Sequence, residues 1–438
     1  MKIHFIGIKG SGMSSLALIC KSLGYEVTGS DVDLFIFTQK ELEEHEIPIY
    51  SFDAKNIKDN MNVVIGNAFD ASNLEVKEAL ANKTVDAVYY YEFLGRLIDQ
   101  YESISVAGTH GKTTSTSMIK SLLVPYKETG YLIGDGTGVL LKNSELFVVE
   151  SCEFQDHFLN YHPDYALITN IDLDHVDYFK SLEQYIQSFQ TFVNQVKNGV
   201  VLFGDDNNVR KLSTHELKVL YYGLSYENDI YPKNLEEVNH QSHFNLIVCG
   251  EDWGTVTVDF IARHNLCNLL GSIGIAHLVG VPRKMILEHI SDFKGTHRRF
   301  NVEDFGERVY IDDYAHHPTE IRVTIEACRL RFDNKRVVIV YKPDRVSRTQ
   351  YFEKEFREAL LTADAAYVID FPPTAFKEDP SYSMDKFLKG LGEEVIYLSD
   401  DLNGVSKLAE NGDAIYLFVS TKDVYKYKDK LKEFFKDL

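Results

Sequence analysis

A glycine-rich loop in the first third of the chain, SVAGTHGKTTST at residues 105–116, constrains the local fold more than any other segment. Apolar Ile104 and Val106 predict a strand that leads into it. Glycines let backbone N–H groups converge on an anion, a lysine adds positive charge, and a threonine hydroxyl can hold Mg²⁺. The segment predicts a strand–loop–helix unit that binds nucleoside triphosphate phosphates through Gly108, Thr109, His110, Gly111, Lys112, Thr113 and Thr114.

The loop differs from the usual phosphate-binding pattern at one position. That pattern, G-x-x-x-x-G-K-[ST], would place glycine at position 106, where this chain has Val106. Taken alone, the loop is also compatible with an ordinary turn between a strand and a helix.

Apolar strand patterns alternate with helical patterns along most of the chain. This alternation predicts an α/β protein with parallel sheets and helices on both sheet faces. Changes in the pattern suggest three domains, at residues 1–102, 103–295 and 296–438. Residues 210–262 are more polar and irregular, which predicts antiparallel strands and long connections and so a mixed central sheet.

Composition narrows the possible partners and the cellular location. The 438 residues carry a formal charge of −20, which argues against binding nucleic acid or an anionic membrane. The five cysteines are scattered without a CxxC pair, so neither a disulfide framework nor a structural zinc site is expected. No apolar run has the length of a membrane span. We therefore expect a cytoplasmic protein without membrane insertion.

Near the N-terminus, apolar Ile3, Phe5, Ile6 and Ile8 predict a first strand, and a second glycine turn lies at Gly7, Gly10 and Gly12. Asp31 follows at about the distance at which dinucleotide-binding folds place a ribose-binding acid. The turn could hold a diphosphate at the start of the next helix. A tight turn with close helix packing is the alternative.

Two side chains follow predicted strands of the central domain, where ligands bind in open α/β sheets. Glu150 ends the strand LFVVE, and His175 follows the strand that leads to TNIDLDH. With the hydroxyl of Thr113 they could hold Mg²⁺, supported by Asp172 and Asp174. Capping of a turn or helix is the alternative for each residue alone.

Further polar candidates lie around and beyond the boundary between the second and third domains. Asn265 and Asn268 could cap a helix or contact an adenine edge. Arg298 lies in a pair of arginines that suits phosphates but could equally be solvated. Arg345 and Arg348, three residues apart after a buried strand, could converge on a carboxylate or phosphate. The segment DDYAHHPTE at 312–320, which contains Asp313, favours a nucleotide or substrate site over a zinc site.

These segments together resemble the Mur ligases, and the resemblance covers nearly the whole chain. It rests on an ordered set of motifs: HFIGIKGSGMSSLA, AGTHGKTT, the Glu150 strand, TNIDLDH, ARHNLCN, THRRF and DDYAHHPTEI. The resemblance implies a Rossmann-like N-terminal domain, a central P-loop-type ATPase domain with a mixed sheet, and a Rossmann-like C-terminal domain.

The resemblance also implies a reaction in peptidoglycan precursor synthesis. ATP and Mg²⁺ would activate the carboxylate of UDP-N-acetylmuramate as an acyl phosphate, which L-alanine then attacks. Lys112 and Thr113 would contact the ATP phosphates and metal, and Glu150 and His175 would serve the metal. The nucleotide would be bound by Asn265, Asn268, Arg298 and Asp313. The carboxylate of the amino acid would be bound by Arg345 and Arg348. The UDP-sugar would be bound by Gly7, Gly10, Ser11, Gly12 and Asp31. A monomer or weak homodimer is expected.

Three segments depart from the pattern of the family. Cys152 stands where an aspartate is usual, Lys342-Pro343-Asp344 replaces Gln-Pro-His, and 420–423 reads STKD in place of Gly-Ala-Gly-Asp. The last two fall in the domain expected to bind the amino acid. They leave open another amino acid, such as glycine or serine, or a non-catalytic nucleotide-binding regulator. The N-terminal glycine turn alone would also allow a dehydrogenase.

Overall fold

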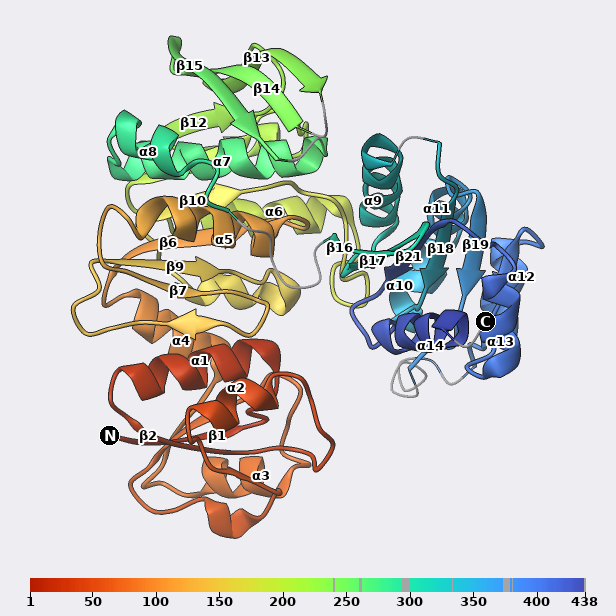
Figure 1. Ribbon diagram of the computed structural model, residues 1–438. Helices are drawn as coiled ribbons and strands as arrows, with labels where there is room; N and C mark the ends of the chain where they lie inside the picture. The colour runs from red at the N-terminus through yellow and green to blue at the C-terminus, as the bar shows by residue number, and fades with distance from the viewer. Residues whose placement is uncertain are drawn as a thin grey trace.

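The computed structural model describes residues 1–238, 241–259, 262–293, 300–332, 334–372, 379 and 381–436. Its strands form three separate sheets that follow one another along the chain, each accompanied by helices (Figure 1). This arrangement confirms the predicted α/β class and the mixed central sheet. The boundaries at 102 and 295 stay predictions, although the central sheet begins with a strand at Glu102.

The N-terminal sheet is parallel, with the strand order β3-β2-β1-β4-β5. We expected its first strand to reach Ile8, but the strand ends at Ile6 because Gly7 adopts a φ of +84° and turns the chain. The elements are β1 (Lys2–Ile6), α1 (Ser11–Ser22), β2 (Glu26–Ser30), α2 (Gln39–Glu44), β3 (Ile49–Tyr50), η1 (Ala54–Asn56), β4 (Asn62–Ile65), α3 (Leu74–Ala81), β5 (Asp86–Tyr89) and α4 (Tyr90–Ile98).

The central sheet has the order β15-β14-β13-β12-β11-β10-β6-β9-β7-β8 and places the phosphate loop after its strand β6. It is parallel from β12 to β7, and β13, β14 and β15 pair antiparallel, as predicted for the polar stretch. The strands are β6 (Glu102–Ala107), β7 (Thr129–Leu132), β8 (Gly138–Val139), β9 (Leu146–Glu150), β10 (Tyr165–Ile168), β11 (Gly199–Phe203), β12 (Lys218–Tyr222), β13 (Ile230–Val238), β14 (Gln241–Val248) and β15 (Glu251–Val258). The helices are α5 (Lys112–Leu123), η2 (Phe154–Asn160), α6 (Leu182–Val193), η3 (Val209–Lys211), α7 (Arg263–Val279) and α8 (Arg283–His289).

The third sheet has the order β16-β17-β21-β18-β19-β20 and is parallel except for its edge strand β16. Its strands are β16 (Asn301–Phe305), β17 (Arg308–Asp313), β18 (Val337–Tyr341), β19 (Ala365–Val368), β20 (Val395–Tyr397) and β21 (Ile415–Val419). Its helices are α9 (Pro318–Arg331), α10 (Val346–Tyr351), α11 (Glu353–Leu360), α12 (Met384–Leu391), α13 (Leu402–Ala409) and α14 (Tyr425–Lys436).

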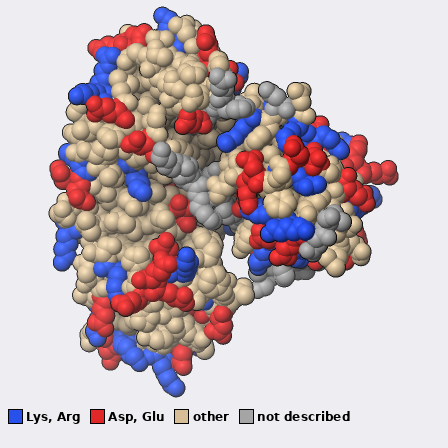
Figure 2. Space-filling view, in the orientation of Figure 1, with Lys and Arg blue, Asp and Glu red and all other residues tan. Residues whose placement is uncertain are grey.

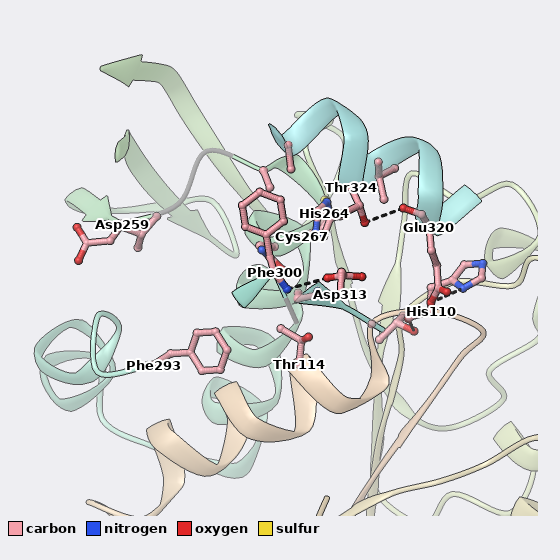
Figure 3. A pocket seen from close by; sticks show the side chains of 18 of the residues that line it. His110, Thr114, Asp259, His264, Cys267, Phe293, Phe300, Asp313, Glu320 and Thr324 are labelled. Atoms are coloured by element: carbon pink, nitrogen blue, oxygen red, sulfur yellow. Dashed lines mark hydrogen bonds and ion pairs between the residues drawn. The ribbon is translucent and has the colours of Figure 1, made fainter. Parts of the chain in front are cut away.

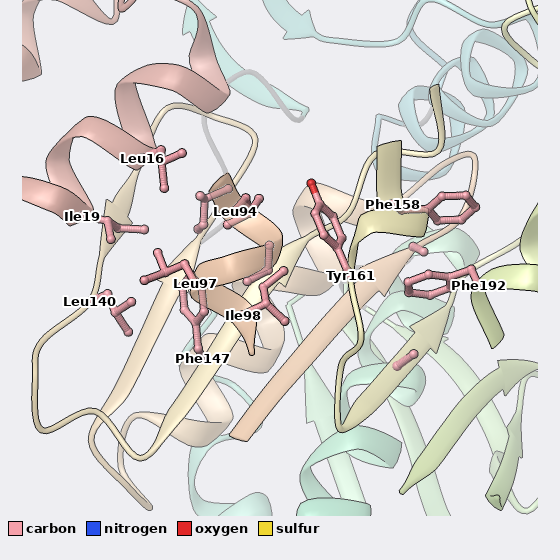
Figure 4. Close-up of a cluster of buried hydrophobic side chains, with 14 of the residues drawn as sticks. Leu16, Ile19, Leu94, Leu97, Ile98, Leu140, Phe147, Phe158, Tyr161 and Phe192 are labelled. Atoms are coloured by element: carbon pink, nitrogen blue, oxygen red, sulfur yellow. The ribbon is translucent and has the colours of Figure 1, made fainter. Parts of the chain in front are cut away.

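The N-terminal and central domains share one hydrophobic core. Leu16 of α1 and Leu97 of α4 belong to the same buried cluster as Leu140, which follows β8, and Phe147 of β9 (Figure 4). Burial of apolar surface is the main stabilising term in such a joint, so these two domains are expected to move as one body.

A short segment that follows β10 makes several of the contacts between the central and third domains. The sheet of the third domain has separate apolar clusters on its two faces, and Leu173 and Val176 of the central domain pack against one of them. Around these apolar contacts, Asp172, Asp174 and Asp177 bond to residues of the third domain. We call residues 172–177 the linking segment. Because this segment adds only two partly buried apolar side chains to its polar contacts, we expect this junction to separate more readily than the shared N-terminal core.

Within the described part of the chain, no helix has the length and apolar character needed to cross a membrane. On the face drawn in Figure 2, basic side chains are interspersed with acidic ones.

Candidate functional site

The phosphate loop is held in shape by the end of the neighbouring strand β10. Two glycines make the bend possible, since Gly108 has a φ of +136° and Gly111, which precedes α5, has a φ of +80°. The N–H of His110 donates to Asn170 Oδ1 at 2.9 Å, and the hydroxyl of Thr169 donates to the carbonyl of His110 at 2.6 Å. The loop therefore has the strand–loop–helix form that the sequence predicts.

Lys112 lies at the start of α5 with its ammonium group turned back over the loop. Its Nζ donates to the carbonyls of Gly108, at 2.5 Å, and Thr109, at 2.9 Å, and lies 2.9 Å from Glu153 Oε2. Burial opposes the charged forms of both side chains, but their mutual attraction prevails, raising the pKa of Lys112 and lowering that of Glu153 to about 2. The ammonium is thus charged and directed at the loop that would hold an anion.

Thr113 and Glu150, two of the three predicted metal ligands, lie in contact. The Thr113 hydroxyl donates to Glu150 Oε1 at 3.1 Å, and Glu150 Oε2 accepts the N–H of Gly134 at 2.8 Å. His175, the third, has its Nε2 3.5 Å from Glu153 Oε1. Its buried Nδ1 has no hydrogen-bond partner among the described residues. Hydroxyl and carboxylate oxygens in contact, as at Thr113 and Glu150, and an imidazole with an open nitrogen, as at His175, are groups that fit a divalent cation.

Glu153 is a site residue that no sequence motif indicated. It is 1% exposed and joins Lys112 to His175. Its only signal in the sequence was its position three residues after Glu150, just beyond the end of β9.

A cavity of about 620 Å³ adjoins the loop on the side of the third domain (Figure 3). Gly111 and Thr114 of the loop region line it, and so do three predicted nucleotide contacts, Asn265, Asn268 and Asp313. Asp313 is anchored, since its two oxygens accept the N–H groups of Phe300 and Ala315 at 2.7 Å each; Arg298, the fourth predicted contact, lies outside the described residues. The cavity is large enough for a nucleotide-sized ligand.

His110 connects the phosphate loop to the third domain. Its Nε2 lies 3.0 Å from Asp172 Oδ2 and its Nδ1 3.2 Å from Glu320 Oε1, while Thr319 also donates to Asp172, at 2.7 Å. Burial alone would lower the pKa of His110, but the hydrogen bonds to Asp172 and Glu320 outweigh burial and raise it to about 9. Burial and the nearby His110 lower the pKa of His317 to about 4. His110 is therefore the cationic member of this group at neutral pH.

This ion pair predicts a pH-dependent stability. Because the folded pKa of His110 lies above the value of about 6.5 for an unfolded chain, its contribution is complete below pH 6.5 and disappears as the pH rises through about 9. We expect His110→Gln to lower the thermal denaturation midpoint at pH 6 and to have much less effect at pH 9.5. The maximum contribution is about 3 kcal/mol, at 1.36 kcal/mol per pKa unit. His45→Gln, at an exposed histidine, is the control, and an equal loss at both pH values for His110→Gln would contradict the prediction.

The two predicted carboxylate-binding arginines have different surroundings. Arg345 has 31% of its side chain exposed, lies 3.1 Å from Asp177 and stacks over the Phe154 ring. Arg348 is 4% exposed and pairs with both Asp174 and Asp344. The structure thus brings both arginines to the linking segment, but only Arg345 has a substantial exposed surface.

At the N-terminal glycine turn, α1 begins at Ser11 with Gly10 as its cap. Asp31 is 6% exposed, and its oxygens accept the N–H groups of Lys9 and Val32, both at 2.7 Å. In this arrangement the carboxylate stabilises the turn. Its expected contact with a ribose stays a prediction.

Comparisons with known proteins cover all three sheets. Three family models match: "Mur ligase family, catalytic domain" at residues 2–102, "Mur ligase middle domain" at 106–276, and "Mur ligase, glutamate ligase domain" at 298–420. The chain is 40% identical over 431 residues to the UDP-N-acetylmuramate–L-alanine ligases of Lactobacillus johnsonii and Lactobacillus gasseri, covering 98% of this chain and 97% of each relative.

The crystal structure of UDP-N-acetylmuramate–alanine ligase from Thermotoga maritima shares the fold, with a TM-score of 0.80 at 24% identity over 100% of this chain and 99% of that one. The Thermotoga maritima MurF ligase in complex with ADP has a TM-score of 0.66 at 19% identity, over 87% of this chain and 96% of that one.

Proposed function

This chain belongs to the Mur ligase family, and we propose that it joins L-alanine to the muramoyl carboxylate of UDP-N-acetylmuramate with cleavage of ATP. Relatives with this named activity match 98% of the chain at 40% identity. The structural observation that carries the proposal is the phosphate loop itself: it holds Lys112 and the Thr113–Glu150 pair, and its Gly111 and the adjoining Thr114 line a nucleotide-sized cavity between two domains.

The chemistry requires activation of the carboxylate. A carboxylate oxygen attacks the γ-phosphorus, the bond to ADP breaks, and an acyl phosphate forms. The alanine amine then attacks the acyl carbon, loses a proton, and phosphate leaves with one of the original carboxylate oxygens. Because two anions must meet in the first step, positive charge at the phosphates is essential.

Lys112 supplies part of that charge, and the loop N–H groups supply further donors. Thr113, Glu150 and His175 are the residues that would hold Mg²⁺. When bound, Mg²⁺ offsets the negative charge of the phosphates. Glu153 keeps Lys112 and His175 in place before the substrates arrive.

Other residues would bind the nucleoside of ATP, the diphosphate of the UDP-sugar and the carboxylate of the amino acid. Asn265, Asn268 and Asp313 line the cavity and would contact the nucleoside of ATP, and Arg298 would lie near its phosphates. Gly7, Gly10, Ser11 and Gly12 would face the diphosphate of the UDP-sugar. Arg345 is the better placed of the two arginines to bind the amino-acid carboxylate, because much of its side chain is exposed. The enzyme would work in the cytoplasm as a monomer or weak homodimer.

A series of amino acids tests the proposal. Phosphate release from ATP is measured with UDP-N-acetylmuramate, Mg²⁺ and L-alanine, glycine or L-serine. We expect release that depends on the amino acid and is fastest with L-alanine. Faster phosphate release with glycine or L-serine would show that one of these is the preferred amino acid, and the proposed ligase reaction would stand. No amino-acid-dependent release from folded protein would contradict the ligase and favour a nucleotide-binding regulator.

A further inference from the structure

We infer that Arg348 is a positioning residue that reaches from the third domain to Asp174 and, through it, sets the backbone of His175, so that docking of this domain completes the phosphate and metal site. The inference rests on the proposed function. It gives Arg348 a different task from Arg345, although the two arginines are three residues apart in the sequence.

The guanidinium of Arg348 is fully engaged by two protein carboxylates. Nε lies 2.9 Å from Asp174 Oδ1 and Nη2 lies 3.1 Å from Asp174 Oδ2, a two-pronged pairing between domains. Nη1 donates to both oxygens of Asp344, at 2.8 and 2.9 Å. Because Arg348 is only 4% exposed, a substrate carboxylate would have to displace a buried protein carboxylate to bind it.

Asp344 belongs to this chain's departures from the family pattern, and the other departures lie around it. Thr421 donates to Asp344 Oδ2 at 3.2 Å, and Lys342 pairs with Asp423 at 2.6 Å. Two altered residues, Thr421 and Asp344, therefore contact each other at the ends of β18 and β21, and the altered Lys342 pairs with Asp423, which matches the family pattern. These contacts hold the Asp344 carboxylate against Nη1 of Arg348. The edge of the guanidinium that carries Nε and Nη2 is thereby directed at Asp174.

Asp174 links Arg348 to the predicted metal ligand His175. The same oxygen that Arg348 Nε contacts, Asp174 Oδ1, also accepts the N–H of His175 at 2.7 Å. His175 has a φ of +51°, a left-handed conformation that a non-glycine residue adopts only when its surroundings impose it. That conformation brings the imidazole within 3.5 Å of Glu153, which in turn pairs with Lys112.

Loss of the Arg348–Asp174 pairing should therefore affect the metal rather than the amino acid. The variants are Arg348→Lys, which keeps the charge but not the fork, Asp174→Asn, which is nearly isosteric, and the double variant. Arg345→Lys is the matched control from the same turn. Two quantities are measured: the Mg²⁺ concentration that gives half-maximal ADP binding by calorimetry, and the KM for L-alanine in phosphate release.

We expect Arg348→Lys and Asp174→Asn each to raise the Mg²⁺ requirement about tenfold, as for other residues that orient metal ligands, and to leave the KM for L-alanine within about twofold. The double variant should be no worse than either single variant, since both break one pairing. Arg345→Lys should show the reverse pattern.

An unchanged Mg²⁺ requirement in folded Asp174→Asn, or a large rise in the KM for L-alanine in Arg348→Lys, would overturn the inference. Absence of alanine-dependent release from the unaltered protein would instead count against the proposed function. The ADP-binding measurement would still decide the role of Arg348 in that case, because it needs no turnover.

Discussion

Replacing Lys112 with alanine is expected to reduce amino-acid-dependent phosphate release by about 10³-fold or more, the scale of losing a preorganised charge at a reacting anion. The ammonium lies over the carbonyls of Gly108 and Thr109 and remains charged because Glu153 faces it. Without it, the carboxylate and the terminal phosphate would meet with much less compensation. Initial rates at saturating substrates, measured on folded protein, give the comparison.

The variant also leaves Glu153 buried without its main counter-charge, which typically destabilises a protein by about 3–5 kcal/mol. The double variant Lys112→Ala/Glu153→Gln removes that charge and should keep the fold without recovering turnover. Lys120→Ala is the control on the same helix, where Nζ lies over the Tyr131 ring; its rate should stay within about twofold of the unaltered protein, as expected for a surface substitution. Normal rates in either Lys112 variant would refute the role of this lysine.

Substituting alanine for Gly108 should have the second-largest effect, a loss of about 100-fold in ADP affinity. A side chain at this position is strained, at about 1–3 kcal/mol, because φ is +136°. In addition, a β-carbon would overlap Thr169 Oγ1 and lie 3.0 Å from the backbone nitrogen of Thr169. The loop must therefore shift, and the carbonyl that anchors Lys112 shifts with it. Calorimetric titration with ADP and Mg²⁺ measures the loss.

Gly412→Ala separates loop geometry from general strain. Gly412 also has a positive φ, +64°, but a β-carbon there would meet nothing within 4 Å. Its substitution should cost about 1 kcal/mol of stability and leave ADP affinity unchanged. Equal losses of affinity in the two variants, or none in Gly108→Ala, would show that the shape of the loop does not determine binding.

Features carried by contiguous residues were predictable from the sequence. The order of strands and helices, the phosphate loop and the position of Glu150 at a strand end follow from local periodicity and from glycine chemistry. The Thr113–Glu150 contact was predictable because the carboxyl ends of parallel strands lie at the same edge of a sheet, so residues that follow two such strands come together. Even there, the backbone decided details: Gly7 ended the first strand two residues before the expected Ile8.

Pairings between distant side chains were not predictable in the same way. Asp31 fits the spacing of a ribose-binding acid, yet its oxygens are taken by backbone N–H groups. Glu153 was not among the residues predicted from the sequence, although it joins Lys112 to His175. No local pattern indicates which carboxylate will neutralise a buried cation, since that depends on how two domains meet.

The source of the oxygen in the released phosphate tests the central claim most directly. UDP-N-acetylmuramate labelled with ¹⁸O in its carboxylate is converted in the presence of ATP, Mg²⁺ and L-alanine, and the phosphate is analysed by mass spectrometry. If the muramoyl carboxylate is activated as an acyl phosphate, each released phosphate carries one oxygen from that carboxylate. Phosphate released without the label would contradict the account, because ATP cleavage would then not pass through the carboxylate.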